Sequence, residues 1–154
     1  MKARLAAFGK AIARALGIEY SCYRMFSLDL VSLPEPNPPP PGYRCAEVTE
    51  DEVREARQPA IQADAWYCGN DSLGFGVFFG SDLVALQWVW FGDGYRRRRN
   101  FWPLERNEAK SVELVTAPEY RGLGLATCLK QFSARRLAAK GFVRVYSRIW
   151  WNNW

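Results

Sequence analysis

Two glycines between an apolar strand and an amphipathic helix form the stretch of this sequence best suited to chemistry. Residues 112–115 read as a strand, residues 121–126 read R-G-L-G-L-A, and a helix follows directly. The first amides of a helix have no internal acceptor, and the helix dipole adds positive potential there. Glycine lets the backbone approach an anion closely. The stretch therefore predicts a phosphate-binding loop, although an ordinary strand-to-helix turn fits the same pattern.

The helix after the loop is read from its apolar spacing. Leu125, Leu129 and Phe132 fall at i, i+4 and i+7, and Gly141 stands where a helix commonly takes a left-handed C-terminal residue. Two other phosphate loops fit less well. The glycines are not followed by the Lys-Ser/Thr pair of a Walker A loop, and they lack the G-x-G-x-x-G spacing of dinucleotide-binding folds.

The whole string V-T-A-P-E-Y-R-G-L-G-L-A-T resembles the acyl-CoA signature of the GNAT N-acetyltransferase superfamily. The core of that signature is Arg or Gln, two residues, Gly, one residue, and then Gly or Ala. Arg121, Gly124 and Ala126 fill those three places, and the preceding Pro-Glu-Tyr is also typical of the family. The resemblance covers residues 43–154 and is specific over residues 112–127.

This resemblance implies an α/β (mixed α+β) fold with a central, mostly antiparallel sheet flanked by helices. It implies transfer of an acetyl group from acetyl-CoA to a primary amine by direct attack, without a metal. Loop amides would bind the pyrophosphate, and the backbone of the preceding strand would hold the thioester and pantetheine. The residues implied in binding the acyl-CoA are Leu114, Val115, Arg121, Gly122, Leu123, Gly124, Leu125, Ala126, Thr127 and Asn153.

Glu113 is the carboxylate nearest to the implied thioester site along the sequence, which makes it the candidate general base. The attacking amine must lose a proton, and the chain contains no histidine to accept it. A surface or ion-paired role for Glu113 stays open. The four cysteines are scattered without metal-ligand spacing, so we expect neither a zinc site nor a histidine-based triad.

The composition predicts one ordinary hydrophobic core, because 49% of the 154 residues are hydrophobic. The net charge is +5, and residues 94–154 hold thirteen basic and four acidic side chains. This charge suits the phosphates of coenzyme A, and equally nucleic acid or an anionic membrane. An arginine run at 96–99 and a basic helix expected at 1–16 are the features behind that less favoured alternative. No signal peptide or membrane-spanning run is visible, so we expect a cytoplasmic protein.

We expect three parts in the chain: a basic helix and an extended segment at 1–33, a proline-rich linker at 34–42, and a GNAT-like domain at 43–154. Within that domain the patterns predict strands at 43–48, 74–79, 83–90 and 142–150. Thr49 and Glu52 form a capping box that opens a helix to about Arg57, and helix resumes from Pro59 to Trp66. Trp88 and Trp90 should share one face of their strand.

Family members normally continue past the last predicted strand with a helix and two further strands, and this sequence ends there. We therefore expect a C-terminally truncated GNAT fold, with an exposed strand edge that favours a homodimer. A non-catalytic, acyl-CoA-binding module is the first alternative to an active enzyme. We expect residues 58–70 and 92–107 to face the acceptor, but they identify neither the amine nor the acyl chain length. No general acid is assigned.

Overall fold

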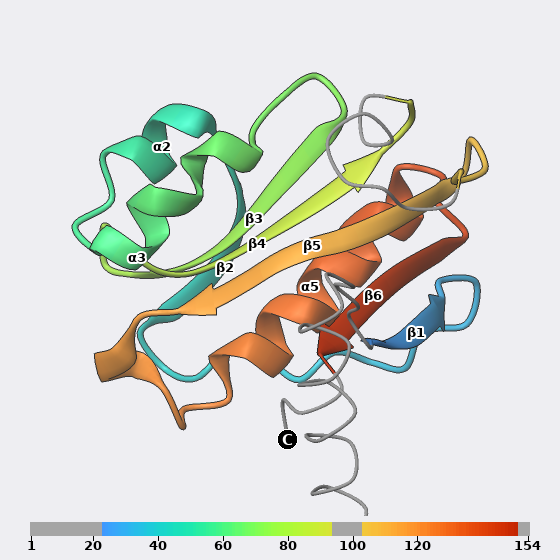
Figure 1. Cartoon of the computed structure of the whole chain (residues 1–154). Helices are drawn as coiled ribbons and strands as arrows, with labels where there is room; N and C mark the ends of the chain where they lie inside the picture. The colour runs from blue at the N-terminus through green and yellow to red at the C-terminus, as the bar shows by residue number, and fades with distance from the viewer. Residues whose placement is uncertain (1–22, 94–102, 151–154) are drawn as a thin grey trace, which may run out of the picture. The chain divides into compact units, whose positions relative to one another are not determined.

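The computed structural model describes residues 23–93 and 103–150, and its centre is a six-stranded sheet (Figure 1). The strand order is β1-β6-β5-β4-β3-β2. The strands are β1 (Tyr23–Asp29), β2 (Tyr43–Val48), β3 (Ser72–Phe79), β4 (Asp82–Phe91), β5 (Glu108–Thr116) and β6 (Arg144–Trp150). The helices are α2 (Glu50–Arg54), α3 (Pro59–Gln62) and α5 (Leu125–Ala139), with 3₁₀ turns η1 (Ala63–Tyr67) and η2 (Pro118–Tyr120).

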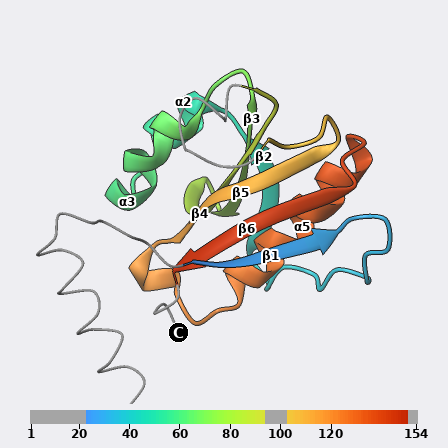
Figure 2. The same cartoon turned by 45° about the vertical axis from the view of Figure 1, so that its right-hand side comes forward.

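The sheet is mostly antiparallel, as the sequence predicted. β2 pairs with β3, β3 with β4, and β4 with β5 in antiparallel ladders. β5 and β6 pair in parallel, because α5 carries the chain back across the sheet between them. β1 lies beside β6 at one edge, where Figure 2 shows it in front. The expected mixed α/β architecture is therefore confirmed.

The helices cover opposite faces of the sheet (Figure 1). On one face, α2, α3 and η1 contribute Val53, Ile61 and Tyr67 to a core that also contains Trp88 and Trp90 of β4. On the other face, α5 contributes apolar side chains to a second core: Leu125, Leu129, Ala134 and Leu137. The sheet thus separates an α2–η1 face from an α5 face, and the two tryptophans share one face as expected.

Local signals set where the helices begin and end. Thr49 and Glu52 form the predicted capping box, in which the Thr49 side chain accepts from the Glu52 amide and the Glu52 side chain accepts from the Thr49 amide. α2 ends at Arg54 and not at about Arg57. Pro59 begins α3, and the preceding Gln58 is extended, as a residue before proline tends to be.

β5 begins four residues earlier than predicted. Glu108 and Lys110 are charged, yet both residues are buried in the strand. Glu108 accepts a hydrogen bond from the Tyr146 hydroxyl at 2.9 Å and pairs with Arg144 at 3.4 Å. These partners on β6 compensate the buried charge, so the strand extends through it.

The proline-rich segment runs beside α5. The Asn37 amide donates to Gln131 at 2.9 Å, and Arg135 donates to the Pro34 carbonyl. The chain divides into a compact unit Phe26–Ser147 and a smaller unit of 1–25 and 148–154. Both sides of the proline-rich segment belong to the larger unit. The division into parts at 1–33, 34–42 and 43–154 stays a prediction.

Three predictions fall outside the described residues: the basic helix at 1–16, the arginine run at 96–99, and Asn153. Within 23–93 and 103–150, no helix combines the length and the apolar character needed to span a bilayer. The same ranges contain no group of three or more metal-ligating side chains.

Candidate functional site

The loop between β5 and α5 has the geometry of an open anion cradle. Gly122 and Gly124 have φ values of 80° and 75°, in the left-handed region that favours glycine. A Cβ placed on either glycine would have no neighbour within 4 Å, so the space beside the backbone is empty. Gly124 is the N-cap of α5. The Arg121 side chain donates from Nε to the Thr116 carbonyl at 3.1 Å, which ties the loop to the end of β5.

The amides of residues 122–127 meet no acceptor in the described part of the chain. The first α-helical bond of α5 is donated by Cys128 to the Gly124 carbonyl at 3.1 Å. The first turn of α5 carries no acidic side chain that would occupy its positive end. A fifteen-residue helix therefore presents a row of free N–H donors to the solvent, which is the arrangement that binds phosphate groups.

β5 leaves its β6 neighbour halfway along its length. The described ladder joins Glu108 to Arg144 and ends where Ser111 meets Ser147. Directly after this point the pairing with β4 shifts by one residue, so that Val112 is the extra residue of a β-bulge. A bulge bends the strand that carries it and increases its twist. Residues 111–116 are half-buried, whereas Glu108, Ala109 and Lys110 are buried, so the strand becomes exposed where its pairing ends.

Glu113 projects to the α2–η1 face, where it meets Tyr67. The Tyr67 hydroxyl donates to Glu113 Oε2 at 3.1 Å, and the Leu114 amide donates to Oε1 at 3.1 Å. The half-buried carboxyl of Asp64 is a second acid on this face. Burial, and then the charge of Glu113, raises the pKa of Asp64 from 3.8 to about 6. A carboxyl that titrates there can exchange a proton near neutral pH.

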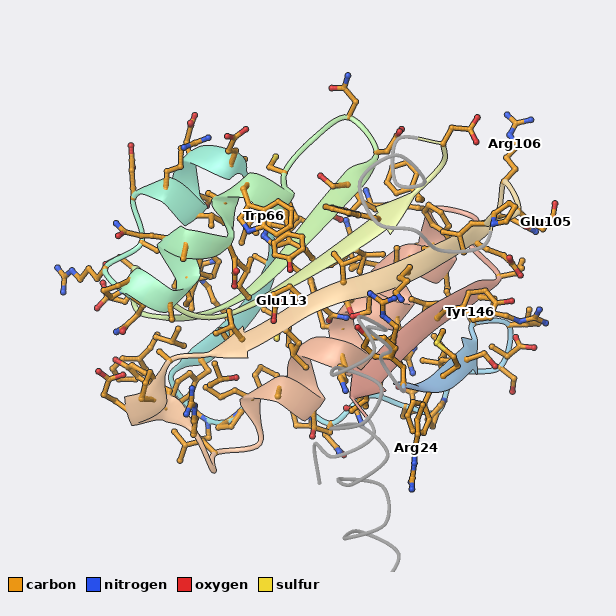
Figure 3. All side chains as sticks on the ribbon, in the orientation of Figure 1. Arg24, Trp66, Glu105, Arg106, Glu113 and Tyr146 are labelled. Atoms are coloured by element: carbon orange, nitrogen blue, oxygen red, sulfur yellow. The ribbon has the colours of Figure 1, made fainter. Side chains whose placement is uncertain are left out.

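Aromatic side chains hold η1 against the sheet. The Trp90 indole donates to the Tyr67 carbonyl at 2.7 Å, and the Trp66 and Tyr67 rings lie 3.8 Å apart. Trp66 is 49% exposed. Figure 3 shows Trp66 above β5 near the position of Glu113. These contacts hold Tyr67, which hydrogen-bonds Glu113, against the sheet.

No family model matches this sequence, and no curated protein does either. Solved structures match it by shape. A tandem GNAT protein from the clavulanic acid biosynthesis pathway aligns with a TM-score of 0.58 and 18% identity over 95% of this chain and 51% of that one. A GCN5-related N-acetyltransferase from Kribbella flavida aligns with a TM-score of 0.54 and 11% identity, over 80% of this chain and 46% of that one. The ribosomal-protein-S18-alanine N-acetyltransferase from Escherichia coli aligns with a TM-score of 0.53 and 14% identity, over 72% of this chain and 69% of that one.

The chain has the GNAT fold. It spans about half the length of the first two matched structures. The residues that the sequence singled out lie close together along the chain: the half-buried part of β5, which contains Glu113, Leu114 and Val115, leads through the 3₁₀ turn η2 into the loop 121–127. The Leu125 side chain is buried in the core, so this residue offers only its amide to the loop.

Asp64 and Tyr67 are the functional candidates that the sequence did not single out. Both lie in the region 58–70 that we expected to face the acceptor, but no motif marks either one. The hydrogen bond from Tyr67 to Glu113 spans 46 residues of sequence. Both residues lie in a 3₁₀ turn, whose spacing the 3.6-residue pattern of an α-helix does not reveal. A raised proportion of aromatic residues at 66–67 was the only local signal.

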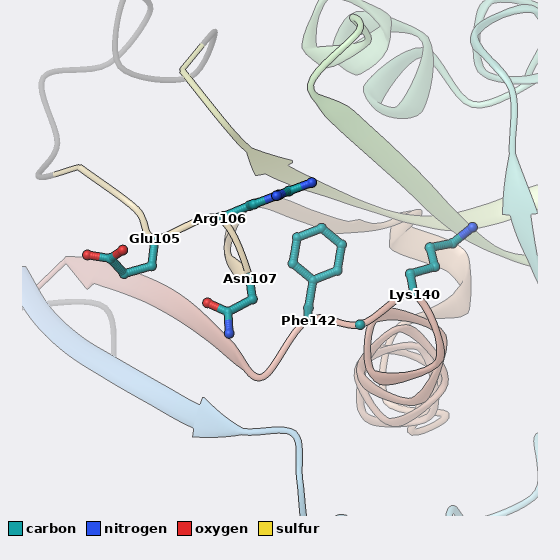
Figure 4. A pocket seen from close by; sticks show the side chains of 6 residues that line it. Glu105, Arg106, Asn107, Lys140 and Phe142 are labelled. Carbon is teal, nitrogen blue, oxygen red and sulfur yellow. The ribbon is translucent and has the colours of Figure 1, made fainter.

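A separate hollow of about 450 Å³ lies at the far ends of the same elements (Figure 4). It is lined by Glu105, Arg106, Asn107, Lys140, Gly141 and Phe142. These residues precede β5 and follow α5, whereas the glycine loop joins the opposite ends of the two elements. The hollow is therefore distinct from the candidate site.

Proposed function

We propose that this chain transfers an acetyl group from acetyl-CoA to a primary amine. One observation carries the proposal: the open row of amides at 122–127, which follows the half-buried end of β5 after the 3₁₀ turn η2. Phosphate groups bind such a helix N-terminus because backbone donors and the dipole act together. The GNAT fold of the chain supports coenzyme A as the source of those phosphates.

In this proposal the donor lies along the loop and the edge of β5. The amides of 122–127 hold the pyrophosphate, and Arg121 stiffens the loop through the Thr116 carbonyl. The pantetheine arm and the thioester follow the backbone at Leu114 and Val115, beyond the last described pair of the β5–β6 ladder. Asn153 stays a predicted contact.

The acceptor approaches from the α2–η1 face. Glu113 takes a proton from the ammonium form of the amine, and the amine nitrogen then attacks the thioester carbonyl carbon. The developing oxyanion needs fixed N–H donors, for which the backbone of β5 beyond the ladder is the candidate. Collapse of the tetrahedral intermediate breaks the C–S bond, and coenzyme A leaves as a thiolate that takes up the proton which the new amide nitrogen releases. Tyr67 orients the Glu113 carboxylate through its 3.1 Å hydrogen bond.

Calorimetric titration with acetyl-CoA tests the donor site, using the variant Gly124→Glu. The new side chain brings bulk and negative charge into the cradle, and we expect at least about tenfold weaker binding. Gly80→Glu is the matched control, because Gly80 also has a positive φ and open space around its Cβ but lies in the β3–β4 turn. Equal binding by all three proteins would refute the proposed cradle.

Thiol release from acetyl-CoA in a panel of primary amines tests the transfer step. Release that depends on both the amine and Glu113 supports an enzyme. Tight binding of acetyl-CoA without release by any amine would favour the non-catalytic module instead. A homodimer stays a prediction, which the elution volume of the purified chain would check.

A further inference from the structure

Two cysteines that are distant in the sequence meet beside the first turn of α5. The Sγ atoms of Cys45 in β2 and Cys128 in α5 are 3.5 Å apart, although 83 residues separate the two cysteines in the chain. Cys45 is half-buried, and Cys128 is buried. A disulfide bond is roughly 2.05 Å long, so the sulfur atoms would approach by about 1.5 Å to form one. The fold therefore brings into contact two thiols that no sequence motif connects.

Ion pairs farther along α5 hold this helix against β2. Glu47 pairs with Arg136 at 2.7 Å and with Lys140 at 3.2 Å. Glu47 and Cys45 are two residues apart in β2, so their side chains lie on the same face of the strand. The two sulfur atoms therefore meet within an interface of two regular elements that other contacts hold in register.

A third cysteine, Cys68, lies on the other face of the sheet. It packs against the core of the α2–η1 face, whereas Cys45 packs against the core of the α5 face. Because the sheet separates it from the pair, Cys68 is a matched control. The fourth cysteine, Cys22, lies outside the described residues.

Cys128 directly follows the glycine loop 121–127. It is the fourth residue of α5, and its amide donates the first α-helical bond to the Gly124 carbonyl at 3.1 Å. β2 pairs with β3 along its whole length. A covalent bond from Cys128 to Cys45 would therefore restrain the first turn of α5, because this turn could open only against the pairing of the sheet.

We propose that Cys45 and Cys128 form a reversible disulfide, which ties the first turn of α5 to β2 under oxidising conditions. This modification goes beyond acetyl transfer and does not depend on it. The oxidant is a low-molecular-weight disulfide such as oxidised glutathione. One protein thiolate attacks it and releases one glutathione thiolate, and the second protein thiolate then displaces the other from the mixed disulfide. The protein loses two electrons and two protons, and one oxidised glutathione becomes two reduced molecules.

The acidity of the pair sets how fast the exchange proceeds in the folded chain. Burial, and then the hydrogen bond with Cys128, raises the pKa of the Cys45 thiol to about 12. The attack requires a thiolate, which such a thiol supplies only in trace amounts at neutral pH. We therefore expect the pair to follow a sustained change in redox conditions and not a brief one.

Refolding the full chain in glutathione buffers tests the proposal without the barrier of buried thiols. The reduced chain is unfolded in urea and diluted into buffers with different ratios of reduced to oxidised glutathione. Free thiols are then alkylated, and the chain is digested without reductant. Mass spectrometry should identify one dominant linked pair of peptides, which joins Cys45 to Cys128.

The folded chain should keep this disulfide at a glutathione ratio at least about tenfold more reducing than the chain kept in urea does, because the fold holds the sulfur atoms together. A difference below about twofold would overturn the proposal. A dominant link that includes Cys22 or Cys68, or a refolded chain with four free thiols in the most oxidising buffer, would also overturn it.

Cys68→Ser should keep the crosslink, whereas Cys45→Ser and Cys128→Ser should each remove it. Hydrogen exchange measures the effect on the helix: the Cys128 amide should exchange at least about tenfold more slowly in the crosslinked wild-type chain than in the reduced one. Loss of the crosslink in Cys68→Ser, or equal exchange in the two states, would overturn the proposed tie. None of these measurements uses acetyl-CoA, so failure of the crosslink and failure of the proposed transfer are distinguishable.

Discussion

Replacing Asp64 by Asn should stabilise the folded chain at neutral pH, even though it damages the candidate site. Burial, and then the charge of Glu113, raises the pKa of Asp64 from 3.8 to about 6. Between these two values the folded protein holds the proton more firmly than the unfolded chain does. The free energy of unfolding therefore falls as the pH rises through this window, and the loss is complete above about pH 6.

The size of the effect follows from the shift. A rise of this size corresponds to about 3 kcal/mol, at about 1.4 kcal/mol for each pKa unit. Asp64 is only half-buried, so water screens its charge, and we expect roughly half of that value, about 1.5 kcal/mol. Near pH 4 the folded protein keeps the group protonated, and the unfolded chain holds it partly protonated. The difference should therefore fall to about 0.3 kcal/mol.

Urea unfolding of the wild-type chain, Asp64→Asn and Asp51→Asn at pH 7.5 and at pH 4 measures this difference. Asp64→Asn should unfold at higher urea than the wild-type chain at pH 7.5 and at nearly the same urea at pH 4, with equal m-values. Asp51→Asn, which makes the same change in charge at an exposed position of α2, should show no such dependence on pH. If Asp64→Asn is less stable than the wild-type chain at pH 7.5, then Asp64 has a favourable partner in the fold, and the reasoning on an uncompensated site fails.

Two further substitutions test how α5 is fixed to the sheet. Ser133→Ala removes a hydrogen bond of 2.8 Å to Gln87, which is 4% exposed. The substitution should therefore lower the free energy of unfolding in urea by about 1–3 kcal/mol, and a decrease below about 0.5 kcal/mol would contradict this. Burial acts to raise the pKa of Glu47, but its hydrogen bonds from Arg136 and Lys140 outweigh burial and lower it. Glu47→Gln should therefore cost up to about 1 kcal/mol at pH 7 and progressively less as the pH falls below about 4; a cost that does not change with pH would show that the ion pairs contribute nothing.

The glycine loop 121–127 was predictable because its determinants are local. The left-handed φ values of Gly122 and Gly124, the helix start at Leu125 and the left-handed Gly141 all follow from residues within a few positions of one another. The capping box at Thr49 is local in the same sense. A short stretch of sequence contains the cause of each of these features, so their prediction needs no tertiary contact.

The arrangement on the α2–η1 face was not predictable because its determinants are distant in sequence. Asp64 becomes a candidate because burial and the charge of Glu113 raise its pKa, and the Tyr67 hydroxyl reaches Glu113 across 46 residues. The early start of β5 has the same origin, since Glu108 is tolerated in the sheet only because β6 brings Arg144 and Tyr146 to it. The sequence shows the residue types but not the contacts that give them their roles.

The β-bulge at Val112 connects the two halves of the proposed site. Ser111 and Glu113 are two residues apart, so in a regular strand both side chains would lie on the same face. Ser111 instead accepts from Gln87, which also binds Ser133 of α5, while Glu113 meets Tyr67 on the opposite face. The extra residue reverses the alternation and turns Glu113 toward the α2–η1 face. The described β5–β6 ladder ends at the same place. The inserted residue therefore places the candidate base on the opposite face of the sheet. It also marks the point where β5 loses its β6 partner, which is the strand edge along which the thioester is proposed to lie.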